Sequence, residues 1–520
     1  MVMIDVKKLP LDIKIGQMIM AGFTSKHYDS SLEKLITDDR IGNFILFSRN
    51  IEEKNQLTRL TEDIQKGLES NIKIPGIISV DQEGGMVTRI NSGITIFPGN
   101  MAFAAANQPH STFRQGKIEG EELRGLGVNM NLAPVMDVNC NPNNPVIGVR
   151  SYGDSPEKVA EMGLGLIKGL KESKVVSVAK HFPGHGDTDV DSHLSLPVVK
   201  HSIKRLRKVE LLPFKTAIEN GIDAIMSAHV LFPEIEPKRL PATLSYRVLT
   251  GLLRNKMGFK GIIITDCMEM KAIAEFYGSD KAAVMAIKAG ADLICISHSA
   301  AVQKACIRRI KEAVINKEIP EERINESVKR ILEIKEKYSI SFNTVEKNYD
   351  INNSLFAEEI SDKGITLLKN DKSLIPLKGR IVSISTKAVA LTGVEDNMSL
   401  NNSFCHKLKE NFGGSEFQIP INPDKEMIDR ILEKCLDADS IVIGIYNAHN
   451  HEGQRKLVHE ISKVNPNIIL VSLRNPYDFL YFKEVSAYIN AYEYTNLSVK
   501  SVIKVLSGRV EAQGISPVRL

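Results

Sequence analysis

One loop of the chain is unusually dense in residues that transfer protons or bind metals. It reads KHFPGHGDTDVDSH over residues 180–193 and contains three histidines and three aspartates. Asp191 and His193 are two residues apart, so in extended backbone their side chains share one face. A carboxylate in that position can orient an imidazole and raise its proton affinity. The pair therefore predicts a general acid/base that works near neutral pH.

The same loop allows two other interpretations. Asp187, Asp189 and Asp191 have the spacing that opens a calcium-binding loop. The sixth and twelfth positions of such a loop are Gly and Glu, whereas here they are Ser192 and Val198. The spacing argues against a metal, and we expect no cofactor. The acidic and histidine side chains could also cap backbone groups without any catalytic role, and the residues alone leave that alternative open.

A second candidate group is Asp266, which directly follows the apolar run Gly261–Thr265. A barrel strand presents its last side chain at the mouth of the active site, where a carboxylate could attack a substrate. Retaining glycoside hydrolysis requires one nucleophilic carboxylate and one separate acid/base. The alternative is that Asp266 caps a helix over Met270–Phe276, an arrangement that Glu269 three residues later would also suit.

The elements that must position these groups alternate regularly along the chain. From residue 41 to about 338, short apolar runs alternate with amphipathic segments, which predicts parallel βα units. Polar residues follow directly on the strand ends, as DQEGG does after Val80. We expect a helix over Glu157–Lys171, with Ser155 as N-cap and Pro156 at its first position. The expected strands are Gly42–Phe47, Gly76–Val80, Val128–Leu132, Val175–Ala179, Ala224–Ala228, Gly261–Thr265 and Ala291–Ile296. A barrel of eight strands requires one strand in addition to these seven.

The pattern predicts two domains of the α/β class. Residues 1–338 should form an N-terminal (β/α)8 TIM-type barrel that carries the catalytic groups, and residues 339–353, rich in Asn and Ser, should form a linker. Residues 354–520 should form a smaller C-terminal α/β sandwich domain. We expect a helix-like segment at 357–370 (AEEISDKGITLLKN) to open it. Its expected strands lie near Ile381–Ser385, Ser440–Ile445, Ile468–Ser472 and Val485–Ala491.

Composition narrows the class of partner and the compartment. The chain has 520 residues, with 67 Lys plus Arg against 63 Asp plus Glu, and this small surplus does not predict nucleic-acid binding. No apolar run is long enough for a membrane span. The six cysteines include no CxxC pair, and the N-terminus lacks the apolar core of a signal peptide. We therefore expect a cytoplasmic protein with reduced thiols. Nothing in the sequence indicates an oligomeric state.

These motifs together resemble glycoside hydrolase family 3, and within it the two-domain form of the bacterial NagZ-type β-N-acetylglucosaminidases. The resemblance rests on five motifs between residues 41 and 300, which in chain order are DQEGGMVTRI, NLAPVMDV, NPVIGVRSYG, KHFPGHGDTDVDSH and ITDCMEM. GITLLKN, SLIPL, VSLRNPYDF and AYEYTNLSV resemble the second domain of the longer members. The resemblance thus covers nearly the whole chain.

The resemblance implies a retaining exo-β-N-acetylglucosaminidase that works through a covalent glycosyl-aspartate intermediate. Asp266 matches the nucleophile, His193 the acid/base and Asp191 its partner. The substrate implied is a small carbohydrate or a muropeptide fragment of peptidoglycan. The residues that match contacts to the non-reducing sugar are Asp81, Arg89, Arg150, Lys180 and His181.

Some features depart from the family pattern and keep alternatives open. Met86 stands where the family usually has Arg. The chain has no Trp, and Cys267 follows Asp266, which disfavours the β-glucosidase branch. A phosphorylase that transfers the sugar to phosphate is the closest alternative activity, and a sugar-binding protein without catalysis is another. If His193 were not the acid, Glu452 in HNHEGQ would be the first replacement to consider.

Overall fold

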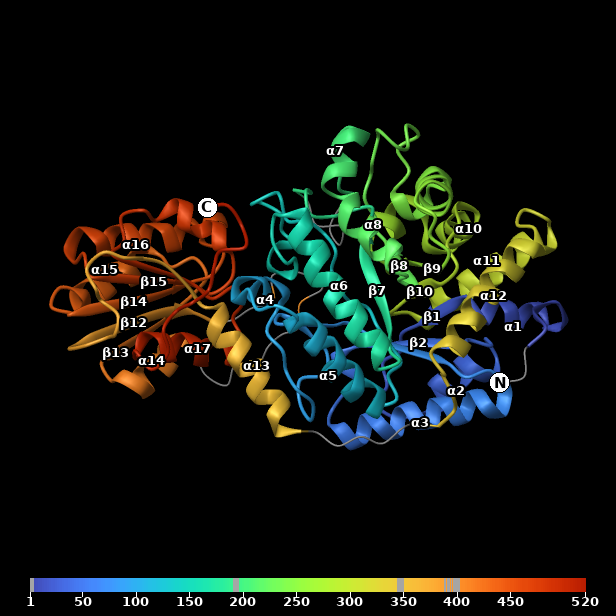
Figure 1. The fold of residues 1–520 in the computed structure, drawn as a ribbon, viewed down its shortest axis with the longest axis horizontal. Helices are drawn as coiled ribbons and strands as arrows, with labels where there is room; N and C mark the ends of the chain where they lie inside the picture. Colours follow the sequence, from blue (N-terminus) through green and yellow to red (C-terminus); the bar gives the residue numbers. More distant parts are fainter. Residues whose placement is uncertain are drawn as a thin grey trace.

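The protein consists of a barrel and a smaller sheet domain that lie side by side (Figure 1). The computed structural model describes residues 4–189, 196–343, 350–387, 390, 393, 395 and 403–520. Within these ranges no helix combines the length and the apolar character needed to cross a bilayer. The order of elements confirms the predicted fold class, a (β/α) barrel followed by an α/β domain.

Eight parallel strands form the barrel, in the order β10-β1-β2-β3-β6-β7-β8-β9. The Thr265 amide donates to the Leu293 carbonyl at 3.0 Å, which brings the two ends of the sheet together. Every strand residue is buried, because helices cover the outside and side chains fill the inside. The strands are β1 Ile19–Ala21, β2 Asn43–Leu46, β3 Ile77–Val80, β6 Met130–Asn131, β7 Val176–Phe182, β8 Ala224–Ser227, β9 Ile262–Thr265 and β10 Ile294–Ile296.

All seven predicted barrel strands are confirmed, and the missing eighth is β1 near the N-terminus. Ile19 pairs with Ile294 of β10, and Met20 pairs with Asn43 of β2, so β1 closes the barrel between them. The strand has only three residues and is separated from the short helix α1 (Leu11–Gln17) by Met18 alone. A run so short gives no measurable alternation, which is why it escaped the sequence prediction.

Helices connect the barrel strands and cover the outside of the sheet. The predicted helix after residue 155 is confirmed as α6 (Pro156–Glu172), and the Ser155 hydroxyl accepts from the Lys158 amide at 3.3 Å. A π-helix covers Arg247–Lys256, and the strands β4 (Gln82–Gly84) and β5 (Val87–Thr88) pair antiparallel outside the barrel. The other helices are α2 Ser30–Thr37, α3 Lys54–Asn71, α4 Asn100–Ala106, α5 Ser111–Gly125, α7 Ile203–Lys208, α8 Leu211–Glu219, α9 Lys271–Tyr277, α10 Ser279–Ala289, α11 Ala300–Ile315 and α12 Glu321–Lys337.

The second domain is a six-stranded sheet in the order β11-β16-β15-β14-β12-β13, with helices on both sides. The four predicted strands are confirmed as β12 (Ile381–Thr386), β14 (Ser440–Ile445), β15 (Ile468–Ser472) and β16 (Ala487–Asn490). Its helices are α13 Ile351–Gly364, α14 Phe404–Phe412, α15 Lys425–Cys435, α16 Glu452–Val464 and α17 Asn496–Leu506.

Two strands of this domain were not predicted. The expected helix over 357–370 is wrong beyond Gly364, where α13 ends and β11 (Thr366–Asn370) begins. β11 pairs antiparallel with β16, so a long-range partner overrides the helix-like pattern of the segment. β13 (Ser415–Ile419) is an edge strand in which only Ile419 is buried, and it lacks the apolar run by which the other strands were recognised.

The two domains meet through apolar side chains as well as hydrogen bonds. Helix α13 packs against α4 of the barrel (Figure 1). The Tyr477 hydroxyl donates to the Asn139 carbonyl at 3.1 Å. A buried cluster contains side chains from both domains: Met101, Ala102, Ala105, Val149, Tyr477, Tyr492 and Val518. Because this contact is apolar and buried, the domains should move together rather than independently.

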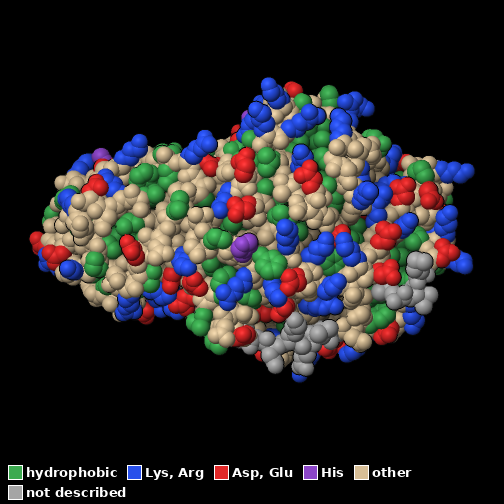
Figure 2. Space-filling view, viewed as in Figure 1, with side chains coloured by type: hydrophobic (Ala, Val, Ile, Leu, Met, Phe, Trp, Pro, Cys, Tyr) green, Lys and Arg blue, Asp and Glu red, His purple; other side chains and the backbone are tan. Residues whose placement is uncertain are grey.

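The described surface carries both signs of charge in close mixture. Figure 2 shows Lys and Arg side chains interspersed with Asp and Glu over the face in view. That distribution agrees with the small net charge of +4. No two of the six cysteines, all of which lie in the described part of the chain, are joined by a disulfide.

Candidate active site

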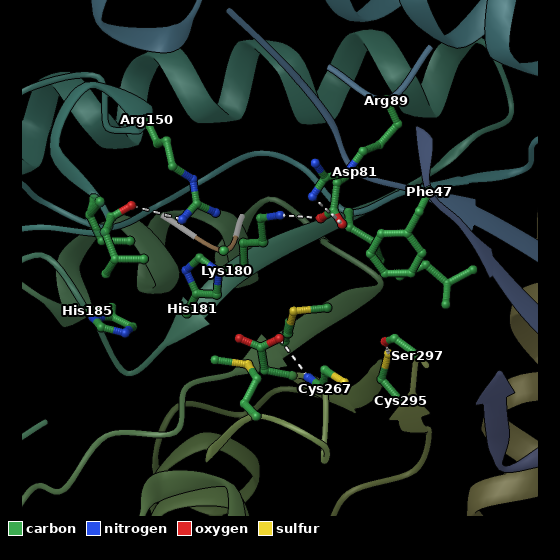
Figure 3. Close-up of a pocket in the computed structure, with 18 of the residues that line it drawn as sticks. Phe47, Asp81, Arg89, Arg150, Lys180, His181, His185, Cys267, Cys295 and Ser297 are labelled. Atoms are coloured by element: carbon green, nitrogen blue, oxygen red, sulfur yellow. Dashed lines mark hydrogen bonds and ion pairs between the residues drawn. The ribbon is translucent and has the colours of Figure 1, made fainter. Parts of the chain in front are cut away.

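A polar pocket lies at the carboxyl ends of the barrel strands. Its lining combines carboxylates, cations and histidines from several strand ends with a few apolar side chains (Figure 3). Asp81 follows β3, Lys180 lies in β7, and Asp266 follows β9. The chemically active or aromatic lining residues are Phe47, Asp81, Arg89, Arg150, Lys180, His181, His185, Asp266, Cys267, Cys295, Ser297 and His298. Six residues that the sequence singled out therefore share this pocket.

Two buried cations and two carboxylates form a continuous network, of which Asp81, Arg150 and Lys180 line the pocket and Glu83 does not. The Lys180 ammonium lies 2.7 Å from Asp81 Oδ1 (Figure 3). It also lies 2.6 Å from Glu83 Oε1. Arg150 donates to both oxygens of Glu83, at 2.9 and 2.8 Å. Burial raises the pKa of Glu83, but Arg150 and Lys180 outweigh that effect and hold its pKa well below the usual range. Glu83 is therefore ionised and fixes both cations in place.

An aromatic ring and a second arginine flank this network. Arg89 Nη2 lies 3.8 Å from Asp81 Oδ2, and its guanidinium is 5.6 Å from the centre of the Phe47 ring. Arg49 lies over the same ring at 4.2 Å. Phe47 directly follows β2, so its position is set by the same rule that places Asp81 and Asp266.

Asp137 organises the first part of the histidine-rich loop. Its carboxylate accepts from the backbone amides of His181 and His185, and it contacts His181 Nδ1 at 2.7 Å. His185 Nδ1 lies 2.9 Å from the Thr188 hydroxyl. Burial lowers the pKa of His185 to about 4, with a further contribution from His181. This shift favours the neutral imidazole of His185 at physiological pH.

Asp266 is held at the pocket and does not cap the following helix. The Cys267 amide donates to Asp266 Oδ1 at 2.7 Å, and His229 Nε2 lies 2.9 Å from the Cys267 carbonyl. Helix α9 is preceded by Met270, which makes no side-chain cap, and Glu269 instead accepts from the amides of His298 and Ser299. The helix-cap interpretation of Asp266 and Glu269 is thus wrong.

Asp191 and His193 fall within residues 190–195, outside the described part of the chain. The described start of their loop is anchored through Asp187, which contacts His201. Asp187, Cys140 and Glu210 bring three donor atoms within 4.8 Å of one another. Arg205, however, donates to Glu210 at 2.8 Å and to Cys140 at 3.5 Å. A guanidinium therefore already contacts two of the three donors, so this group is better described as an ion-pair network than as a metal site.

The second domain contributes to the pocket through Gly393, which lines it. Glu452, the replacement acid considered from the sequence, does not. Its side chain is 69% exposed and pairs with Lys456 at 2.8 Å on helix α16. The structure therefore removes Glu452 from the candidates, because a catalytic acid must reach the bond that breaks.

Sequence reasoning missed Glu83, Asp137 and Phe47. Glu83 and Asp137 lie inside motifs that it quoted, DQEGG and NLAPVMDV, but they act by holding other side chains. The sequence indicates where both residues lie, since each is an acidic residue just beyond a buried apolar segment. It does not indicate that they hold other side chains. Met86, which departs from the family pattern, is buried and is not part of the pocket lining.

The fold and the pocket define a (β/α)-barrel protein with an enzyme-like site at the carboxyl ends of its strands. Comparison with known protein families identifies the family to which this barrel belongs. The chain belongs to glycoside hydrolase family 3, since residues 10–334 match the glycosyl hydrolase family 3 N terminal domain and residues 365–520 match the C-terminal domain.

Individual relatives extend the likeness. A "Beta-hexosaminidase A" of Pseudoalteromonas piscicida is 35% identical over 373 residues, which is 67% of this chain and 62% of that relative. The match thus spans less than two thirds of that relative's length. A "Beta-hexosaminidase" of Nitrosomonas eutropha is 35% identical over 49% of this chain and 73% of its own. The solved structure of a family 3 β-N-acetylglucosaminidase from Paenibacillus sp. str. FPU-7 is 39% identical, with a TM-score of 0.92, and the match covers 98% of this chain and 99% of that one.

Proposed function

We propose that this protein is a retaining exo-β-N-acetylglucosaminidase that releases terminal N-acetylglucosamine from small glycans. The observation that carries the proposal is that Asp266 shares one pocket with the network of Asp81, Arg150 and Lys180. A carboxylate beside a set of charged hydrogen-bonding groups is suited to a sugar, which is dense in hydroxyls. The likeness to the Paenibacillus enzyme over the full length of both chains supports the choice of sugar.

In the first step, the Asp266 carboxylate attacks the anomeric carbon as the bond to the leaving oxygen breaks. His193, oriented by Asp191, donates a proton to that oxygen. The Cys267 amide, 2.7 Å from Asp266 Oδ1, orients the carboxylate for this attack. In the second step, His193 takes a proton from water as the water oxygen attacks the anomeric carbon. The bond from that carbon to Asp266 breaks, so the carboxylate and the protonated His193 are both restored. Two displacements at one carbon retain its configuration.

The non-reducing sugar is bound by Asp81, Arg89, Arg150, Lys180 and His181. Burial lowers the pKa of both Lys180 and Arg150, but nearby carboxylates outweigh it. Asp81 and Glu83 raise the pKa of Lys180, and Glu83 raises that of Arg150, so both side chains keep their charge. Such fixed donors pair with hydroxyl and acetamido oxygens without reorganising. Muropeptide fragments with a terminal N-acetylglucosamine are the substrates we consider first, since the family resemblance points to them.

A panel of p-nitrophenyl glycosides tests the proposal. A pocket that pairs with an acetamido group leaves buried polar atoms unsatisfied when the group is missing, so kcat/KM should favour the N-acetylglucosaminide over the glucoside roughly a hundredfold. Assays with and without phosphate separate hydrolysis from transfer to phosphate, because a phosphorylase releases a sugar 1-phosphate. Equal rates on both glycosides would contradict the assigned sugar, and a phosphate-dependent product would contradict hydrolysis.

A further inference from the structure

A second pocket lies at the opposite end of the barrel from the candidate active site. It has a volume of about 500 Å³ and is lined from the π-helix, α10, α12 and the segment before β9. We call it the cationic pocket, because five of its lining residues are cations: Arg254, Lys260, Lys288, Arg323 and Arg330. Arg254 donates to the Gly261 carbonyl just before β9, which places the pocket at the amino ends of the strands.

Three of these cations converge on a single buried carboxylate, Asp292. Arg330 Nη1 lies 3.0 Å and Arg323 Nη2 3.3 Å from Asp292 Oδ1, while Arg254 pairs with Oδ2. Asp292 is fully buried and also accepts from the Ile263 amide at 3.0 Å. One carboxylate cannot neutralise three guanidinium groups, so positive charge remains on the pocket side of the cluster.

The other lining residues compensate this surplus only in part. Glu326 is the carboxylate in the lining. Its side chain is 51% exposed, and it lies 3.7 Å from Arg330 and 3.9 Å from Arg323. Lys260 and Lys288 are exposed at the rim, and Lys288 lies 3.5 Å from Glu318, outside the lining. Burial lowers the pKa of Arg254 to about 10; Asp292 opposes the shift, and Arg330 and Arg323 add to it. The cluster is thus one that a bound anion would stabilise.

An aromatic side chain completes the pocket. Tyr246 is 60% exposed and lies beside the cations in the lining. Guanidinium groups match the spacing of phosphate oxygens, and an exposed aromatic ring offers a face on which a nucleobase can stack. We propose that the cationic pocket is a binding site for a diphosphate group, either inorganic or carried by a nucleotide. The proposal is independent of the sugar chemistry assigned to the other end of the barrel.

Calorimetric titration of the full-length protein with pyrophosphate and with ADP, at constant ionic strength, tests this site. The test variant is Lys260→Ala combined with Lys288→Ala, because both lysines are exposed and their loss leaves Asp292 paired. The matched control is Lys329→Ala, which removes an exposed lysine from α12 next to Arg330 but outside this pocket. Removal of two charges should weaken binding roughly tenfold or more, while the control stays within about twofold.

The variant Tyr246→Ala distinguishes the two forms of the ligand. A weaker affinity for ADP with unchanged affinity for pyrophosphate assigns the site to a nucleotide. Unchanged affinity for both assigns it to the diphosphate group alone. The proposal is overturned if neither ligand binds the wild type below ~1 mM, if the double variant binds as tightly as the wild type, or if Lys329→Ala loses as much affinity as the double variant.

Discussion

The two cations that we propose bind the sugar, Lys180 and Arg150, depend on a residue that does not line the pocket. Glu83 is buried and contacts both Lys180 and Arg150, so it holds two side chains that otherwise repel each other. An ion pair of this kind adds little net stability relative to apolar residues, but the loss of one partner leaves a buried charge uncompensated. Glu83 is therefore a positioning residue whose effect should appear in both stability and substrate affinity.

We predict that Glu83→Gln lowers the free energy of unfolding by about 3–5 kcal/mol, because Arg150 and Lys180 lose their shared counterion. It should also raise KM, since the two cations are no longer held for the sugar. Chemical denaturation and steady-state kinetics measure the two effects. The control Glu161→Gln breaks an exposed pair with Lys158 at 3.4 Å and should cost less than about 0.5 kcal/mol. Similar losses in both variants would show that burial of the pair is unimportant.

The proton-transfer role of His193 can be tested through leaving groups. We predict that His193→Ala impairs substrates with poor leaving groups far more than activated aryl glycosides, because the latter need little protonation. Asp191→Ala should show the same order more mildly, and azide should partly rescue His193→Ala by attacking the glycosyl intermediate without base assistance. A uniform slowing of every leaving group, with no effect of azide, would make His193 a structural residue.

Three of the site residues that could be predicted from sequence share one property, which is that each follows an apolar run. Asp81 and Asp266 come directly after apolar runs, and Lys180 follows one. Glu83 and Asp137 could not be assigned a role, because holding another side chain leaves no pattern in a single sequence. The partner of a buried carboxylate is set by the fold, as Glu83 and Arg150 show, which are 67 positions apart in the sequence.

At the scale of elements, the second domain fixes the segment between β4 and α4. Glu493 Oε2 accepts from the Gly99 amide at 2.6 Å, and Oε1 accepts from the Thr495 hydroxyl at 2.8 Å. Gly85 has φ of +57°, and a Cβ there would lie 2.5 Å from the Glu493 carboxylate. Both ends of the segment that carries Arg89 therefore contact one side chain of the other domain.

We predict that Glu493 makes stability depend on pH. Burial raises the pKa of its carboxyl from 4.5 to about 7, against the lowering effect of its hydrogen bonds. Between those values the folded state retains a proton that the unfolded state has released, so stability falls as pH rises and is constant above the folded pKa. Across this pH range the free energy of unfolding should fall by a total on the order of 3 kcal/mol.

The measurement is denaturant unfolding of the wild type and Glu493→Gln between pH 4.5 and 8. The difference between them should grow through this window in favour of Glu493→Gln, because glutamine does not ionise. Glu119, whose pKa burial raises to about 8, titrates in both proteins and cancels in the difference. If the free energies of unfolding of the two proteins changed in parallel with pH, ionisation of Glu493 would carry no cost in stability.

The elements that escaped prediction are those whose identity depends on partners rather than on their own residues. β1 is three residues long between β10 and β2, and β11 becomes a strand by pairing with β16. Longer buried strands such as β9 were recognised because an uninterrupted apolar run is typical of a strand covered on both faces. Local pattern thus predicts central strands well, and edge or closing strands poorly.

At the scale of the whole molecule, the two-domain arrangement brings parts of the chain that are far apart in sequence to one site. Gly393 of the second domain lines the same pocket as Asp266, and the apolar contact around Tyr492 holds the domains together. The presence of two domains could be predicted from length and pattern, but their relative placement could not. It depends on the fit of two surfaces, which no local feature of the sequence records.

The proposed mechanism requires Asp266 to form a covalent bond with the sugar. The most direct measurement is inactivation with an activated 5-fluoro N-acetylglucosaminyl donor, followed by mass spectrometry of proteolytic peptides. The fluorine slows hydrolysis of the intermediate, so the sugar should remain attached. We predict one added fluorosugar on the peptide that contains Asp266, and none in Asp266→Ala. A label on another carboxylate, or turnover by Asp266→Ala equal to that of the wild type, would contradict the account.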